Sequence, residues 1–114
     1  MSTLTKVLER NVAEIEKNAD MKEGRFRLGH HLMPPVGWLN DPNGLCWYKG
    51  KYHVFFQYAP FDVEGGLKFW GHYTSVDLVD WKYEGTALYP DSPYDCHGVY
   101  SGSALVEDEK MHLF

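Results

Sequence analysis

The residues most informative about architecture are 38–44, which read Trp38-Leu39-Asn40-Asp41-Pro42-Asn43-Gly44. They follow the pair Pro34-Pro35 and precede a run of aromatic, strand-like sequence. Taken alone they predict a hairpin turn, because proline fixes φ for a turn position and Asn-Gly readily takes the positive φ values of tight hairpins. Asp41 is the chemically reactive member of the stretch, a carboxylate beside that turn.

After Gly44 the hydrophobic pattern has the two-residue period of β-strands. We expect strands over residues 45–48, 52–58, 69–76, 81–84, 99–106 and 111–114. Short turns separate them and no helical segment lies between, which indicates an antiparallel all-β architecture. One four-stranded unit followed by the start of a second is typical of a β-propeller, and the last strand ends at Phe114 without a cap. We therefore expect the N-terminal portion of a longer propeller.

Residues 2–19 predict an amphipathic helix that Ser2 or Thr3 can cap. We expect its apolar face to pack on the rest of the molecule or on another chain. Residues 20–37 form a connector, and its charged part, Met21 to Arg27, is expected to be mobile. The chain then divides into 1–28, helix and connector, and 29–114, the propeller portion. The apolar face of the helix consists of Leu4, Leu8, Val12, Ile15 and Ala19.

Composition excludes several classes of protein. A hydrophobic share of 44% can form a packed core, and a net charge of −5 without a basic stripe argues against a nucleic-acid binder. No apolar run approaches the ~20 residues of a membrane span, and the N-terminus lacks the apolar core of a secretory signal. Cys46 and Cys96 allow one disulfide, but two reduced, buried thiols are the favoured alternative. We expect a cytoplasmic protein.

We expect neither a metal site nor a cofactor. His30-His31 has no further ligand at a useful spacing, and the other four histidines are scattered along the chain. Several further acidic residues could form a carboxylate pair with Asp41, although nothing in the sequence places them near it: Asp62, Glu64, Asp91 and Asp95.

Five motifs in a fixed order carry a resemblance to a known family. They are His31-x-x-Pro34-x-x-Gly37 with residues 38–44, Phe55-Phe56-Gln57-Tyr58-x-Pro60, Trp70-Gly71-His72, Ser75-x-Asp77-Leu78-x-x-Trp81 and Tyr100-Ser101-Gly102-Ser103-Ala104. From about residue 29 to residue 114 the sequence resembles the N-terminal part of glycoside hydrolase family 32, the invertases, sucrose-6-phosphate hydrolases, inulinases and levanases. Two departures concern substrate subsites: Ala59 stands where many members have Asn, and Gly65-Gly66 follows Glu64 where many have a substrate-contacting Trp.

The resemblance implies a five-bladed β-propeller, here its first blade and part of the second, followed in the family by a β-sandwich. It also implies retaining cleavage of a β-fructofuranosyl bond, with Asp41 as the nucleophile. The family's Arg-Asp-Pro and Glu-Cys motifs do not occur in these 114 residues, and the second of them provides the general acid/base. The chain by itself is therefore expected to be inactive.

By the same match, seven residues are expected to bind the fructosyl unit: Trp38, Leu39, Asn40, Gln57, Trp70, Tyr100 and Ser101. From the residues alone, core packing explains either tryptophan equally well, and Gln57 reads as one polar residue of an alternating strand. Residues 100–101 likewise read as plain strand. We expect Ser103, His72 and Asp77 to be structural.

Three functions remain in competition. The first is an intracellular hydrolase of sucrose or sucrose 6-phosphate. The second is a fructan hydrolase or fructosyltransferase of the same family, which shares the first half-reaction. The third is a non-catalytic carbohydrate-binding or interaction module, which would form homo-oligomers through its helix or its open sheet edges.

Overall fold

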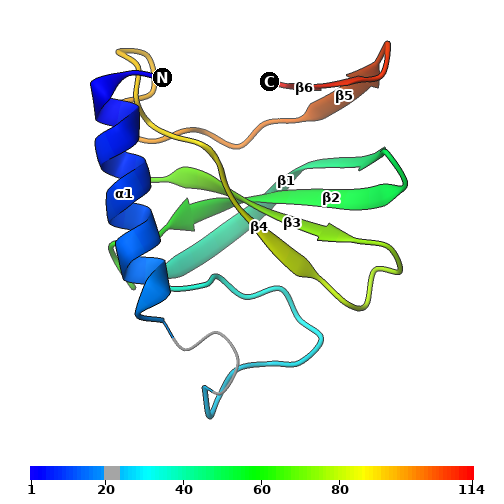
Figure 1. Ribbon diagram of the computed structural model, residues 1–114, viewed down its shortest axis with the longest axis horizontal. Coiled ribbons are helices and arrows are strands. Elements are labelled where there is room, and N and C mark those ends of the chain that lie inside the picture. The colour runs from blue at the N-terminus through cyan, green and yellow to red at the C-terminus, as the bar shows by residue number, and fades with distance from the viewer. Residues whose placement is uncertain (20–23) are drawn as a thin grey trace.

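The computed structural model describes residues 1–19 and 24–114. In that part of the chain one helix precedes six strands. The elements are α1 (Thr3–Lys17), β1 (Trp38–Tyr48), β2 (Lys51–Ala59), β3 (Phe69–Ser75), β4 (Lys82–Leu88), β5 (Ala104–Glu107) and β6 (Lys110–Leu113). Strands β1 to β4 form one antiparallel sheet in chain order, and β5 pairs with β6 in a second sheet (Figure 1). The expected all-β unit with an N-terminal helix is confirmed.

The turn expected at Pro42-Asn43-Gly44 is wrong, because these residues lie inside strand β1. The strand begins at Trp38, seven residues before the expected start, and is interrupted by two β-bulges. At the first bulge Asn40 pairs with Gln57 and Pro42 pairs with Phe56, which leaves Asp41 as the extra residue. A bulge interrupts the hydrogen-bond ladder and so tolerates a proline, and it changes the direction of a side chain.

The second bulge lies between Asn43 and Cys46 and depends on Gly44. This glycine has φ of +56°, and a Cβ built on it would lie 2.7 Å from a ring carbon of Phe55. Only glycine fits both conditions. Gly44, which suggested a turn because glycine accepts a positive φ, therefore uses the same positive φ at a bulge of the strand.

Two further strand boundaries differ from expectation. Strand β4 continues to Leu88 rather than ending at 84, since Gly85, with φ of +109°, lets the strand pass an irregularity and pair again with β3. Strand β5 begins at Ala104, and the preceding residues 99–103 belong to no strand.

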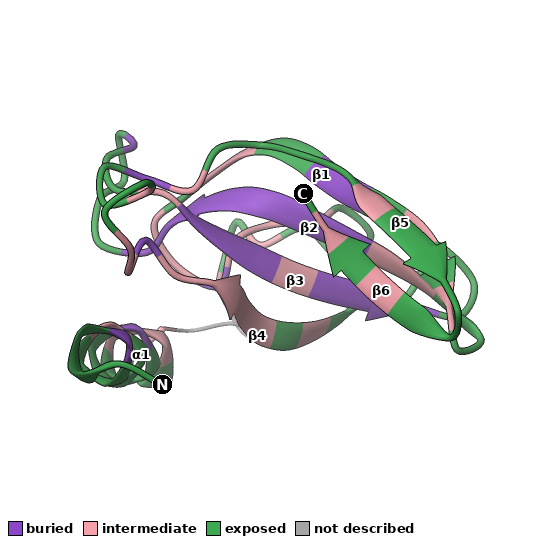
Figure 2. Ribbon diagram, turned by 90° about the horizontal axis from the view of Figure 1, so that it is seen from above, coloured by how far each residue is buried: buried purple, intermediate pink, exposed green. Residues whose placement is uncertain are grey.

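Burial is concentrated on β2 and β3, as Figure 2 shows. Because side chains alternate across a sheet, Phe56 and Tyr58 of β2 share one face with Phe69 and Tyr73 of β3. Val12 of α1 completes this core cluster. The middle of the expected apolar face, Leu8 and Val12, therefore packs on the rest of the chain, which confirms one of the two alternatives there, whereas Leu4 of the same face is 48% exposed.

Polar contacts fix the helix at both ends. The Ser2 hydroxyl accepts a hydrogen bond from the backbone N–H of Thr5 at 3.0 Å, which confirms the expected cap. Near the other end, Oε1 of Glu16 accepts from the hydroxyls of Tyr58 and Tyr83 at 2.9 and 2.6 Å. Burial and this neighbouring carboxylate raise the pKa of both phenols, so they remain donors at neutral pH.

The connector packs on the core cluster through Leu32 and Val36, whereas Phe26 is exposed, and residues 21–23 of the expected mobile stretch lie outside the described residues. The Tyr73 hydroxyl donates to the carbonyl of Met33 at 2.6 Å. Cys46 and Cys96 are free thiols as expected, but their expected burial is wrong, because Cys46 is half-buried and Cys96 exposed. No helix in the described part of the chain is long and apolar enough to cross a membrane.

Candidate active site

Asp41 lies at the first bulge of β1, with its carboxylate exposed to solvent. Its Oδ2 accepts a hydrogen bond of 3.0 Å from the hydroxyl of Ser101, sixty residues later in the chain. The structure thus brings together the two residues that the motifs placed in one pocket. Ser101 belongs to residues 99–103, the irregular segment that crosses to the second sheet.

Asn40 is oriented by its neighbour two residues earlier. The indole N–H of Trp38 donates to Oδ1 of Asn40 at 3.0 Å, which turns the amide NH₂ group toward Asp41. Leu39, between them, packs against the buried core cluster and anchors this part of β1. The beginning of the strand therefore holds one side chain in the core and presents the next two to the site.

These contacts lower the pKa of the Asp41 carboxyl below its usual value. The hydrogen bond from Ser101 is the largest cause, and the one from Asn40 comes second. Donors aimed at a carboxylate stabilise its charged form. Asp41 is therefore ionised at neutral pH and open to solvent, which is what a nucleophilic carboxylate requires.

Two buried side chains support the irregular segment from below. Gln57 is 5% exposed and donates from Nε2 to the carbonyl of Val99 at 2.6 Å. Trp70 is 1% exposed and donates from Nε1 to the carbonyl of Tyr100 at 2.9 Å. Sugar contact stays a prediction for both residues. The nearly complete burial of Trp70 is also what the alternative of core packing predicts. Tyr100, at 90% exposed, and Trp38, at 40%, have faces open to a ligand.

Asn43 was interpreted only as a turn former, yet it supports the site. It is 6% exposed, and its Nδ2 donates to the carbonyl of Asp41 at 3.3 Å. Its Oδ1 is buried without a hydrogen-bond partner among the described residues. The available signal was the known tendency of asparagine to bond to backbone two residues away.

Three of the four acidic residues named as possible partners of Asp41 bind other groups instead. Oδ1 of Asp62 accepts from the backbone of Glu64 at 2.8 Å, and Asp91 accepts from the hydroxyl of Thr5. Oδ1 of Asp95 accepts from the backbone and hydroxyl of Ser92, and Asp77 likewise closes its own loop. The bonds of Asp62, Asp95 and Asp77 close their own turns and loops, whereas Asp91 joins its loop to the first turn of α1.

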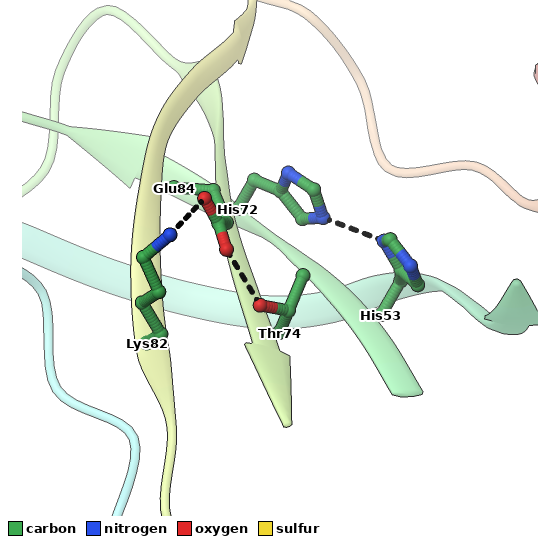
Figure 3. Close-up of polar contacts among 5 residues, drawn as sticks. All are labelled: His53, His72, Thr74, Lys82 and Glu84. Carbon is green, nitrogen blue, oxygen red and sulfur yellow. Dashed lines mark hydrogen bonds and ion pairs between the residues drawn. The ribbon is translucent and has the colours of Figure 1, made fainter. Parts of the chain in front are cut away.

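A second polar cluster lies on the same sheet face, farther from Asp41 along β2 and β3 (Figure 3). Nε2 of His53 lies 3.1 Å from the carbonyl of Tyr48 and must carry a proton, so its Nδ1 accepts from Nε2 of His72 at 2.9 Å. Glu84 accepts from Thr74 at 2.7 Å and pairs with the ammonium of Lys82 at 3.1 Å. Within residues 1–19 and 24–114 no three His, Cys, Asp or Glu side chains are arranged to hold a metal ion.

This cluster predicts a loss of stability in mild acid. Burial, with a smaller contribution from His53, lowers the pKa of His72 from 6.5 to about 4, against an opposing effect of Glu84. Between pH 6.5 and about 4 the unfolded chain binds a proton that the folded chain excludes, so the free energy of unfolding falls as the pH is lowered through this interval. His72→Gln keeps an N–H donor for His53 and should make urea midpoints less dependent on pH there.

The exposed His97 offers a matched control. His97→Gln should leave the slope of the urea midpoint against pH as in the unsubstituted chain. An unchanged slope in His72→Gln would contradict the prediction.

Comparison with known proteins gives concordant matches. Residues 31–114 match the model of the glycosyl hydrolases family 32 N-terminal domain. The chain is 51% identical over 102 residues to a sucrose-6-phosphate hydrolase of Bacillus subtilis strain 168, covering 89% of this chain and 21% of that relative.

Two solved structures are similar to the chain over nearly all of its length. A GH32 β-fructofuranosidase of Bombyx mori matches with a TM-score of 0.83 and 38% identity, covering 95% of this chain and 23% of the other. A sucrose-6-phosphate hydrolase of Lactobacillus gasseri matches with a TM-score of 0.79 and 39% identity, covering 91% and 21%. The chain thus spans about a fifth of the length of these proteins.

Proposed function

The chain belongs to glycosyl hydrolase family 32, and we propose that it contributes the nucleophile and part of the sugar pocket of a retaining β-fructofuranosidase acting on sucrose or sucrose 6-phosphate. The strands β1 to β4 are the first blade of the family's β-propeller, and β5 and β6 begin the second. The observation that carries the proposal is the ionised, exposed Asp41, held by Ser101 and Asn40 at a bulge of the blade.

A retaining mechanism gives Asp41 a defined task. Its carboxylate attacks the anomeric carbon of the fructosyl unit and forms a covalent fructosyl-Asp41 intermediate, which water then hydrolyses. A second carboxyl group, about 5–5.5 Å away in such enzymes, protonates the leaving oxygen. In the family this group belongs to the Glu-Cys motif, which these 114 residues do not contain. The bulge limits the freedom of Asp41 and favours a near-attack geometry.

The surrounding residues suit a polyhydroxylated ring. Asn40 and Ser101 can exchange hydrogen bonds with sugar hydroxyls, and the exposed rings of Trp38 and Tyr100 can form apolar walls. Gln57 and Trp70 lie on the same sheet face as Asn40 and support the pocket from its buried side, whereas the side chain of Leu39 lies on the core face, so that Leu39 can contribute only through its backbone.

Support for a phosphorylated substrate comes from the relatives of Bacillus subtilis and Lactobacillus gasseri, whose names state sucrose-6-phosphate hydrolase. Uptake systems often deliver sugars in phosphorylated form, which favours a cytoplasmic location. A fructan hydrolase or fructosyltransferase shares the covalent step and differs in the acceptor.

A chimeric enzyme tests the proposed function. Here the chain replaces the matching residues of the Bacillus subtilis relative, and fructose release is measured on sucrose, sucrose 6-phosphate, inulin and levan. We expect hydrolysis of sucrose or its phosphate by the chimera. The isolated chain should release no fructose, because its sequence lacks the Glu-Cys motif.

The unmodified relative is the positive control for folding and assay. A folded chimera without activity on any of the four substrates would contradict the proposal, and so would fructose release by the isolated chain. Preferential release from inulin or levan would replace the sucrose assignment by the fructan alternative.

A further inference from the structure

The contact between Ser101 and Asp41 depends on a segment that lies outside both sheets for most of its length. Residues 99–102 pair with no strand, and Ser103 continues the pairing of β5 with β6 by exchanging two backbone hydrogen bonds with Phe114, at 3.0 and 2.9 Å. A hydroxyl on an unpaired segment would sample many positions, at a cost in conformational entropy each time it met the carboxylate. The structure therefore needs other contacts to hold Ser101 in place.

These contacts come from the peptide units on both sides of Ser101. The carbonyl of Val99 accepts from Gln57, and the carbonyl of Tyr100 accepts from Trp70. Beyond Ser101, the carbonyl of Gly102 accepts from the backbone N–H of Gly44 at 3.3 Å. Hydrogen bonds to strands β1, β2 and β3 therefore hold the segment, together with one from the backbone N–H of Val99 to the carbonyl of Lys68 at 3.0 Å.

The contact from Trp70 has a special position among them. A peptide bond is planar, so the oxygen of Tyr100 and the Cα of Ser101 lie in the same rigid unit. An N–H group that fixes this oxygen fixes the direction in which the chain enters Ser101. The donor itself is rigid, because Trp70 is 1% exposed, pairs with Gln57 across the sheet and packs its ring against Phe55.

The pairing continues to the nucleophile. Gln57 lies opposite Trp70 on one side and opposite Asn40 on the other, so one row of residues crosses β3, β2 and β1 beneath the site. One end of this row adjoins Asp41 in the chain and the other end holds the peptide before Ser101. The sheet therefore fixes the positions of both the Ser101 hydroxyl and the Asp41 carboxylate, and with them the distance between the two groups.

We propose that Trp70 is a positioning residue of this site, whose indole N–H holds the Tyr100–Ser101 peptide and thereby places the Ser101 hydroxyl on Asp41. Its relevance to fructoside cleavage rests on the proposed function, whereas the positioning itself does not. A test that reads the ionisation of Asp41 directly therefore separates the two proposals. If the chimera hydrolysed no fructoside, the result of this ionisation test would stay the same.

The experiment is an NMR titration of the Asp41 carboxyl carbon in the full 114-residue chain. Ser101→Ala should raise the pKa of Asp41, because it removes the donor. Trp70→Phe should raise this pKa in the same direction and by no more than Ser101→Ala does. In the double variant the pKa should equal that of Ser101→Ala alone, since Trp70 acts through Ser101.

Tyr73→Phe is the matched control. It removes a buried aromatic donor from the same strand, one that bonds to the carbonyl of Met33 on the opposite face. It should leave the pKa of Asp41 unchanged, which separates loss of this particular hydrogen bond from general weakening of the blade.

A second variant keeps the volume of the indole in case Trp70→Phe disturbs the fold. Trp70 replaced by 3-benzothienylalanine retains a bicyclic ring and lacks the N–H group, and it should raise the pKa of Asp41 as Trp70→Phe does. Four results would overturn the proposal: no shift in Ser101→Ala, no shift in the benzothienyl variant, an additive shift in the double variant, or an equal shift in Tyr73→Phe.

Discussion

Asp41→Ala in the chimeric enzyme is expected to reduce kcat for fructoside hydrolysis by about 10⁴-fold or more, the scale seen when a nucleophile is removed. Without the carboxylate no covalent intermediate forms, and the isosteric Asp41→Asn should lose activity to a similar degree because an amide is a poor nucleophile. KM should change less than kcat, since Asp41 acts mainly in the transition state. The measurement is steady-state release of fructose.

Asp108→Asn is the matched control for this prediction. Asp108 is an exposed aspartate in the turn between β5 and β6, with φ of 49°, a conformation that asparagine also accepts. Its substitution should leave kcat unchanged. Full activity in either Asp41 variant would exclude Asp41 as the nucleophile.

Phe56→Ala is expected to lower the free energy of unfolding of the chain by about 3–5 kcal/mol. Phe56 is 1% exposed at the centre of the core cluster, in ring contact with Tyr58 and Tyr73. The loss combines the transfer of a phenyl ring to water with the cavity that remains. Because small domains are stable by only about 5–15 kcal/mol, it is a large share of the total. Urea unfolding followed by tryptophan fluorescence measures it.

Phe26, which is 82% exposed, provides the control for this substitution. Phe26→Ala removes the same ring from a surface position and should change the free energy of unfolding by no more than about 0.5 kcal/mol. Equal effects of the two substitutions would contradict the assignment of the core. The slope m should be similar in both, so that the midpoints compare directly.

Runs of aromatic and β-branched residues between turn residues predicted most of the blade, although β2 and β3 are buried on both faces and show no alternation of burial. Strands β2 and β3 lie within one or two residues of expectation. The beginning of β1 was not predicted as strand, because the backbone preferences of Pro42 and Gly44 indicate a turn. A bulge uses the same preferences, and only the pairing with β2 decides between the two.

The candidate site was likewise predictable only in part. Asp41, Asn40 and Ser101 were identified from motifs, and the structure brings their side chains together. The hydrogen bonds of Gln57 and Trp70 could not be predicted, because their acceptors are backbone carbonyls 42 and 30 residues away. A carbonyl is present at every residue, so no sequence pattern marks which one a buried donor will meet.

The covalent intermediate on Asp41 is the central claim, and trapping it is the most direct test. The chimera is mixed with an aryl β-fructofuranoside, whose good leaving group makes hydrolysis of the intermediate the slow step, and is quenched in acid during turnover. Peptide mass spectrometry should find one fructosyl unit on the peptide that carries Asp41, and none in Asp41→Asn. A fructosyl unit attached to a different residue, or turnover with every peptide unmodified, would contradict the account.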